Sequence, residues 1–228
     1  MRIVFVRHGH PDYANDCLTP LGHRHAAAAA QRLKQEGITQ IFSSTCGRAY
    51  ETADHLAQVL DLPIVKCDFM REISWGALDD QPIYADGHPW STADHMVANG
   101  ESLMEKDWQT REPFCRNTVI RHAERIAGAT DEWLAGLGYV REGLYYRAVH
   151  PTDKTIAAFG HGGESSVLLS HLFNLPFPFL CTAMGPDYTG ITIVTLSGAP
   201  GELVCPRFEL LNDARHIRGL EAGNYFGN

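Results

Sequence analysis

Residues 1–12 read Met1-Arg-Ile-Val-Phe-Val-Arg7-His8-Gly9-His10-Pro11-Asp12. The run from Ile3 to Val6 consists of β-branched and aromatic residues, which is typical of a buried strand. It ends in a cation, an imidazole and a glycine, and Pro11 prevents a regular continuation. Because α/β sheets bind ligands beyond the carboxyl ends of their strands, the sequence predicts that chemistry takes place at this point.

The segments that follow alternate between strand patterns and helix patterns. Thr19 can cap a helix that begins at Pro20, runs through an alanine-rich stretch and ends near Gly37. Further helices are expected after residues 46 and 161, and a long amphipathic helix at 118–137. Strands are expected at 38–43, 64–67, 155–159, 191–196 and 203–211, the last two forming a hairpin. This alternation predicts an α/β protein.

Composition and charge narrow the function classes. The chain has 228 residues, 44% of them hydrophobic and 20% charged, as in an ordinary globular protein. A net charge of −8 argues against a nucleic-acid partner but leaves room for a small phosphorylated substrate. There is no apolar run of membrane-spanning length, no signal peptide is evident before the first strand, and the six cysteines form no Cys-x-x-Cys pair. These features predict no membrane partner and a cytoplasmic location.

Two other stretches place polar residues directly after expected strands. The first is Ser43-Ser44-Thr45-Cys46-Gly47-Arg48-Ala49-Tyr50-Glu51-Thr52-Ala53, and the second is Gly160-His161-Gly162-Gly163-Glu164-Ser165-Ser166. Taken alone, Arg48 fits a solvated residue in the first turn of a helix, and a lone histidine such as His161 is more often structural. The glycines of the second stretch allow close backbone approach, and the helix after them presents free N–H groups to an anion.

These stretches resemble, together with Arg7-His8-Gly9, the motifs of the histidine phosphatase superfamily, the phosphoglycerate mutase-like proteins. Thr45-Cys46 departs from the Pro-Leu that the family usually has there. The resemblance covers nearly the whole chain. It implies a three-layer αβα sandwich in which helices flank a mostly parallel central sheet. It also implies a single domain over residues 1–228, with a largely helical insertion at about 80–150 over the active site.

The resemblance implies a catalytic role for five residues. His8 would be the nucleophile that forms a phosphohistidine, and Arg7 and Arg48 would grip the phosphate, as bidentate arginines do. A protonated His161 would be a third cationic donor. Glu72 matches the glutamate of the family's Glu-x-x-x-Gly-x-Leu segment, which is the proton donor, and a raised pKa from partial burial is expected for it. No metal and no cofactor are implied.

Other residues are given weaker roles. Glu164 is the fallback proton donor, and Gly162 and His10 are expected to contribute to substrate binding. The segment Leu211-Asn212-Asp213-Ala214-Arg215-His216 is similar to a Leu-Asn-Asp-x-x-His tail in many bacterial members, and a structural role is expected for Asn212 and His216. The aromatic residues that could line the substrate entrance, although such residues are more often core, are Trp75, Tyr84, Trp90 and Trp108.

Several alternatives remain open at the level of sequence. His8, His10 and Asp12 also fit the His-x-His-x-Asp spacing of metal-dependent hydrolases. A phosphoglycerate mutase is disfavoured because that subgroup has Glu-Ser where this chain has His10-Pro11. A non-catalytic member that binds a phosphorylated ligand is a third alternative. The favoured function is hydrolysis of a small phosphorylated metabolite, and the oligomeric state, a homodimer included, stays open.

Overall fold

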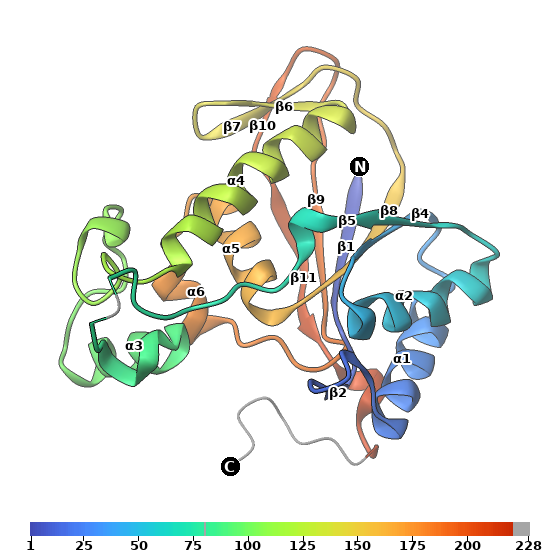
Figure 1. The fold of residues 1–228 in the computed structure, drawn as a ribbon. Helices are drawn as coiled ribbons and strands as arrows, with labels where there is room; N and C mark the ends of the chain where they lie inside the picture. Colours follow the sequence, from blue (N-terminus) through green and yellow to red (C-terminus); the bar gives the residue numbers. More distant parts are fainter. Residues whose placement is uncertain (80, 221–228) are drawn as a thin grey trace.

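The computed structural model describes residues 1–79 and 81–220 and has a six-stranded sheet at its centre (Figure 1). Its strands, in spatial order, are β11 (Arg207–Asp213), β9 (Ile191–Thr195), β1 (Arg2–Arg7), β8 (Thr155–Gly160), β4 (Ile38–Ser44) and β5 (Ile64–Cys67). β1, β8, β4 and β5 are parallel, whereas β9 is antiparallel to both β1 and β11. The sheet is therefore mostly parallel, as the sequence predicts.

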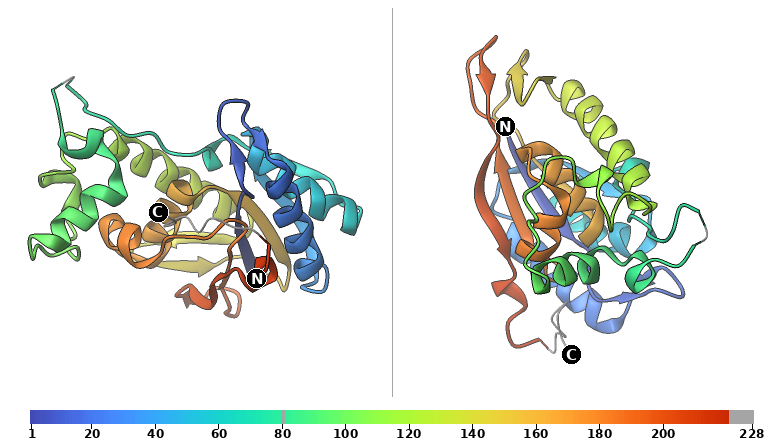
Figure 2. Two further views of the ribbon diagram at one scale, coloured as in Figure 1. Left: turned by 90° about the horizontal axis from the view of Figure 1, so that it is seen from below. Right: turned by 90° about the vertical axis from the view of Figure 1, so that its left-hand side faces the viewer.

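Helices cover both faces of this sheet, which gives three layers (Figure 2, left). One face carries α1 (Pro20–Leu33) and α2 (Gly47–Leu60), and the other carries α4 (Val119–Gly136), α5 (Gly162–Phe173) and α6 (Phe177–Ala183). The side chains of β1 alternate between two cores: Ile3 and Phe5 pack under α4 and α5, and Val4 and Val6 pack under α1 and α2. The predicted αβα sandwich is confirmed.

The helices α1 and α4 begin and end close to the residues that the sequence predicts. Thr19 caps α1, since its hydroxyl accepts the Gly22 N–H at 3.1 Å, and Pro20 occupies the first helical position. The helix expected at 118–137 is α4.

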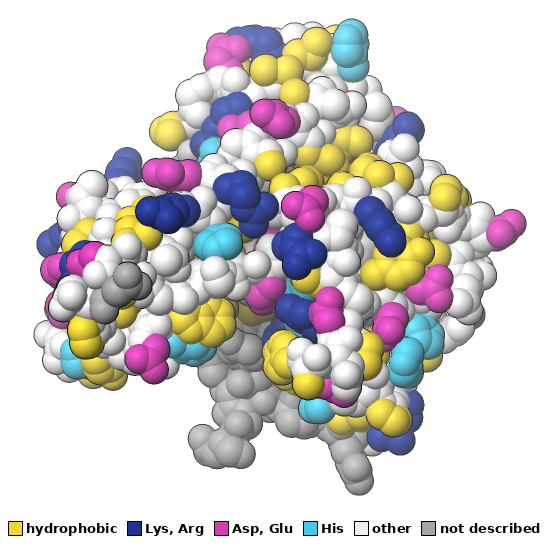
Figure 3. Space-filling model, in the orientation of Figure 1, with side chains coloured by type: hydrophobic (Ala, Val, Ile, Leu, Met, Phe, Trp, Pro, Cys, Tyr) yellow, Lys and Arg dark blue, Asp and Glu magenta, His cyan; other side chains and the backbone are white. Residues whose placement is uncertain are grey.

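No helix among the described residues is long and apolar enough to cross a membrane. On the face seen in Figure 3, acidic and basic side chains are interspersed rather than gathered by sign.

The prediction of a single strand at 203–211 is wrong. The chain divides at Cys205-Pro206 into β10 (Leu203–Val204) and β11, because proline has no N–H for a strand ladder. β10 joins the hairpin of β6 (Tyr139–Glu142) and β7 (Tyr145–Ala148) in a second sheet. β11 pairs with β9 in antiparallel fashion, so the pairing expected of the last two strands is confirmed for these residues.

The block at about 80–150 contains more than helices. α3 (Pro89–Ala98) packs against α6, and α4 packs against α5, but the hairpin β6–β7 also belongs to it (Figure 1). Short 3₁₀ helices lie at Asp68–Met70, Tyr84–Gly87, Trp108–Thr110 and Arg215–Ile217, and a small ribbon is formed by β2 (Pro11–Asp12) and β3 (Cys17–Leu18). Residue 80, where the predicted insertion begins, lies outside the described residues. The organisation as one domain with an insertion stays a prediction.

Candidate active site

The two histidine motifs meet because β1 and β8 are parallel neighbours. Arg7 is in register with Gly160, and the His8 N–H donates to the Gly160 carbonyl at 3.0 Å. His161 follows β8 directly, so the centroids of the His8 and His161 rings lie 5.2 Å apart. Residues separated by about 150 positions in the sequence thus share one strand edge.

His8 is held in the state that a nucleophile requires. Its side chain is buried, and Nδ1 lies 2.7 Å from the Gly9 carbonyl oxygen. That oxygen can only accept, so the contact places the ring proton on Nδ1 and leaves the lone pair on Nε2. Burial, together with the charge of Arg7, lowers the pKa of His8 well below its usual value. The imidazole is therefore neutral near pH 7.

Arg7 is fixed by the loop at 185–190. Its Nη1 donates to the Pro186 carbonyl at 2.6 Å, and its Cζ lies 4.3 Å from the ring centroid of Tyr188. Gly162 lies on another side of the same guanidinium, because a Cβ at that position would be 3.6 Å from Arg7 Nε. A phosphate at Arg7 would therefore meet the start of α5 as well.

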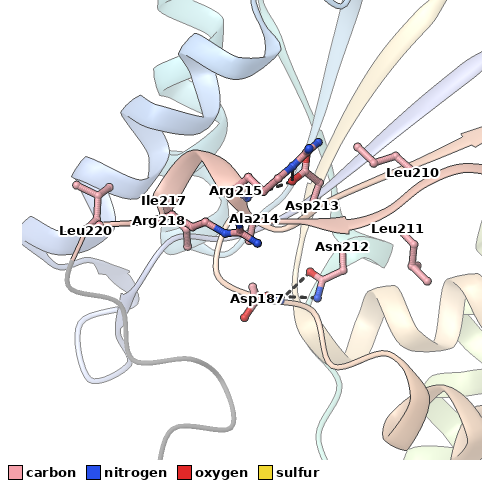
Figure 4. A pocket seen from close by; sticks show the side chains of 11 residues that line it. Asp187, Leu210, Leu211, Asn212, Asp213, Ala214, Arg215, Ile217, Arg218 and Leu220 are labelled. Atoms are coloured by element: carbon pink, nitrogen blue, oxygen red, sulfur yellow. Dashed lines mark hydrogen bonds and ion pairs between the residues drawn. The ribbon is translucent and has the colours of Figure 1, made fainter.

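The C-terminal motif holds the loop that fixes Arg7. Asn212 accepts the Asp187 N–H at 2.9 Å and donates to the Gly185 carbonyl at 3.2 Å, and His216 Nε2 lies 3.0 Å from Thr189 Oγ1. Figure 4 shows Asp187 and Asn212 facing one another at a pocket of about 640 Å³ beside β11. The pocket lining includes Asp187 and Asn212 but not His8. These contacts support the structural role expected of Asn212 and His216.

Arg48 enters the site from the first turn of α2. The Thr52 hydroxyl donates to the Arg48 carbonyl at 2.7 Å and accepts the Gly9 N–H at 3.0 Å, which ties α2 to the first motif. Arg48 is 9% exposed, and within residues 1–79 and 81–220 its Nε has no hydrogen-bond partner. The departure at Thr45-Cys46 leaves this arrangement intact, since Thr45 bonds to Asp68 instead.

A cationic role for His161 depends on its protonation, which its surroundings disfavour. It is fully buried, and burial, followed by the proximity of His8, lowers its pKa well below the usual value. Its Nε2 lies 2.9 Å from Ser44 Oγ, which itself accepts the Cys46 N–H at 3.2 Å. A Ser44 hydroxyl that donates to Nε2 would leave the His161 proton on Nδ1. Without a bound anion, His161 is a neutral donor rather than a cation.

Glu72 lies at the start of α5, although it comes from the segment after β5. Its carboxylate accepts the N–H groups of Glu164 at 2.9 Å, Gly163 at 3.3 Å and Ile73 at 3.0 Å. A Cβ at position 163 would lie 2.8 Å from Glu72 Oε1, which explains the glycine there. Burial raises the pKa of Glu72 against the opposing effect of these N–H groups.

Glu164, the fallback donor, lies deeper. It is 2% exposed, and its Oε2 accepts from the His161 N–H at 3.3 Å and from Ser165 Oγ at 3.1 Å. Burial raises the pKa of Glu164 to about 8. Gly160 makes room for it, since a Cβ there would lie 2.3 Å from Oε2. Because Glu72 is partly exposed and Glu164 is not, Glu72 is better placed to reach a substrate.

The four aromatic residues considered for the substrate entrance divide into two pairs. Trp90 and Trp108 are buried in the core, which is the position that such residues more often take. Trp75 and Tyr84 are exposed, and Trp75 lies edge-to-face against His88 with ring centroids 5.0 Å apart. They remain candidates for substrate contact.

The spacing that suggested a metal site does not bring its three residues together. His8 Nδ1 faces Gly9, and His10 Nδ1 lies 3.0 Å from Thr19 Oγ1. Asp12 accepts the N–H groups of Ala14 and Asn15 within its own turn. In the described part of the chain, no three His, Cys, Asp or Glu side chains are grouped so that they could hold a metal ion.

Three residues around the site were not found from the sequence. Tyr188 packs on Arg7, Tyr13 lies over Arg48 with 5.3 Å between its ring centroid and Cζ, and Asp16 forms an ion pair with Arg48. All three lie in turns or loops without a motif, and their contacts depend on tertiary structure.

Solved structures of other proteins share this fold. The native structure of mycobacterial glucosyl-3-phosphoglycerate phosphatase matches 92% of the chain and is itself covered to 98%, with 25% identity and a TM-score of 0.62. A phosphoserine phosphatase from Entamoeba histolytica, in complex with 3-phosphoglyceric acid, shares the fold at 20% identity, with a TM-score of 0.62 over 95% of the chain and 98% of that protein.

Curated relatives carry a different name. A probable phosphoglycerate mutase GpmB from Yersinia enterocolitica is 29% identical over 77% of the chain and 76% of its own length. The GpmB match from Proteus mirabilis, also 29% identical, covers 46% of the chain and only 57% of that relative. The family model of the histidine phosphatase superfamily (branch 1) matches residues 3–207. With that match over most of its length, the chain belongs to the histidine phosphatase superfamily.

Proposed function

We propose that the chain is a phosphomonoesterase that acts through a phosphohistidine on His8 and uses a small phosphorylated metabolite as its substrate. The observation that carries the proposal is the state of His8, a buried neutral imidazole whose proton is fixed on Nδ1 by Gly9. Such a ring needs no external base, because Nε2 already presents a lone pair. Family membership supports phosphatase or mutase-like chemistry.

The first half-reaction transfers the phosphoryl group to the enzyme. His8 Nε2 forms a bond to phosphorus while the bond to the leaving oxygen breaks, and Glu72 donates its proton to that oxygen. Arg7 and Arg48 neutralise charge on the equatorial oxygens, and a proton on His161 Nδ1 gives a further hydrogen bond. The raised pKa of Glu72, caused by burial, favours the protonated form that this step needs.

The second half-reaction returns the enzyme to its starting state. The Glu72 carboxylate takes a proton from water, the hydroxide forms a bond to phosphorus, and the bond between phosphorus and Nε2 breaks. Inorganic phosphate leaves, and Glu72 is again protonated.

A mutase is the second candidate, because the curated relatives are named probable phosphoglycerate mutases. The residues after Arg7-His8-Gly9 favour the phosphatase. In the mutase subgroup this motif is followed by Glu-Ser, whereas this chain has His10-Pro11. The net charge of −8, with acidic and basic side chains interspersed on the face seen in Figure 3, supports a small substrate rather than a nucleic acid.

The test is hydrolysis of p-nitrophenyl phosphate by wild type and His8→Ala in excess EDTA. We expect turnover in the wild type and none above background in the variant. Glu72→Gln should lose about 100- to 10,000-fold in kcat on alkyl phosphates, which are poor leaving groups, and much less on p-nitrophenyl phosphate. Turnover abolished by EDTA would overturn the metal-free mechanism, and phosphoglycerate interconversion without hydrolysis would identify a mutase.

A further inference from the structure

Two side chains of the turn between β2 and β3 contact the guanidinium of Arg48. Asp16 Oδ1 forms an ion pair with Arg48 Nη1, and Asp16 Oδ2 accepts the Gly47 N–H at 2.7 Å. The Tyr13 ring lies over the same guanidinium, 5.3 Å from Cζ. One carboxylate thus joins the first turn of α2 to the arginine that projects from it.

The backbone of this turn is specialised for the contact. Asp16 has a φ of +49°, in the left-handed region that aspartate tolerates better than most residues. A Cβ at position 47 would lie 2.1 Å from the Asp16 carbonyl oxygen, so only glycine at the start of α2 allows this approach. The Asp16 side chain is 44% exposed, whereas that of Arg48 is only 11% exposed. The contact therefore holds one end of a mostly buried guanidinium from the solvent side.

Resting on the proposed function, we propose that Asp16 is a positioning residue for Arg48. It holds Nη1 against the start of α2, so that the opposite edge of the guanidinium, Nε and Nη2, faces the substrate phosphate. Arg48 Nε is buried and, among the described residues, has no hydrogen-bond partner of its own. A planar guanidinium held at one end presents two parallel donors to a phosphate, and losing that orientation weakens the bidentate grip.

The experiment measures inhibition by orthovanadate and the KM for p-nitrophenyl phosphate in wild type, Asp16→Ala and Asp16→Asn. We expect Asp16→Ala to raise the inhibition constant of orthovanadate and the KM about tenfold each, with a smaller change in kcat. Asp16→Asn, which keeps an oxygen for Gly47, should lie between alanine and wild type. Glu142→Gln is the matched control, because Glu142 pairs with Arg147 on the distant β6–β7 hairpin at a similar exposure of 51%.

A double-mutant cycle shows whether Asp16 acts through Arg48. In an Arg48→Ala background, Asp16→Ala should have no further effect on orthovanadate binding, measured by calorimetry, which does not depend on turnover. Equal or tighter binding by Asp16→Ala than by wild type would overturn the positioning role. Orthovanadate binding that follows this pattern in a wild type without turnover would contradict the proposed function alone. Circular dichroism of each variant confirms that it is folded.

Discussion

Two glutamates lie at the start of α5, Glu164 in its first turn and Glu72 in the segment after β5, yet their surroundings differ. Glu72 accepts three N–H groups and remains partly exposed, whereas Glu164 lies behind it, 2% exposed, with one N–H and one hydroxyl as donors. The side chains that influence Glu164 include Glu72, Arg125 on α4 and Cys67 at the end of β5. A negative charge on Glu164 would oppose binding of an anionic substrate, so a neutral Glu164 suits the site.

The raised pKa of Glu164 predicts how stability depends on pH. Burial raises this pKa from the usual 4.5 to about 8, so the folded protein retains a proton that the unfolded chain releases. Glu164 therefore destabilises the fold progressively as pH rises from about 4.5 to about 8. We expect Glu164→Gln to gain stability relative to wild type between pH 5 and pH 8, by on the order of a few kcal/mol. Urea unfolding at both pH values measures this, and parallel pH profiles for the two proteins would contradict it.

At the scale of elements, the start of α5 is where a strand, a helix and a remote segment meet. At Gly163 the helix lies very close to the segment that carries Glu72. A Cβ at this position would lie 2.5 Å from Ile73 Cγ1 and 2.8 Å from Glu72 Oε1. Real Cβ atoms do not approach other atoms so closely, so a side chain at 163 would push the segment that carries Glu72 away from α5. The glycine therefore serves the placement of Glu72.

Gly163→Ala should therefore lower kcat and stability together. We expect about a tenfold or greater loss in kcat, because displacing a general acid by a fraction of an ångström removes much of its effect, and a loss of about 1–3 kcal/mol from overpacking. Gly128→Ala on α4 is the control, since no atom lies within 4 Å of a Cβ at that position. That change should stabilise the protein by about 0.5–1 kcal/mol and leave kcat unchanged. Equal kinetics for Gly163→Ala and wild type would refute the argument.

The elements that could be predicted are those with strong local patterns. β1 and β8 are apolar runs that end in glycine-containing motifs, and α1 has a threonine cap followed by proline. The hairpin β6–β7 was missed because its residues show no clear alternation, and the division of β10 from β11 was missed although Pro206 marks it. Local sequence identifies an element more readily than its partner in a sheet.

In the candidate site too, residues in local motifs could be predicted from the sequence, and residues that depend on tertiary contacts could not. His8, Arg48, Glu72 and His161 could be identified because each lies in a motif, and the structure brings their segments together around the ends of β1, β8 and β4 and the starts of α2 and α5. Asp16, Tyr13 and Tyr188 could not, because their relevance comes from contacts made across the fold. The protonation state of His161 also depends on burial that the sequence does not reveal.

At the scale of the whole molecule, the last strand, β11, helps to position Arg7 at the end of the first strand, β1. Asn212 at the end of β11 holds the loop 185–190 through Gly185 and Asp187, and that loop contacts Arg7 through Pro186 and Tyr188. The Thr189 N–H also donates to the His8 carbonyl at 3.3 Å. The position of Arg7 therefore depends on a residue more than 200 positions further along the chain.

Asn212→Ala should loosen this connection. The change removes the three hydrogen bonds of the side-chain amide and places alanine at a φ of +47°, so we expect a loss of about 1–3 kcal/mol in stability. Asn174 is a matched control, because it has a φ of +55° and donates to the Leu144 carbonyl at 2.9 Å, at the end of α5. Asn174→Ala should lose similar stability without changing orthovanadate affinity, whereas Asn212→Ala should weaken that affinity several-fold. If the two variants bound orthovanadate equally well, Asn212 would serve folding alone, and Arg7 would be held sufficiently by its own contacts.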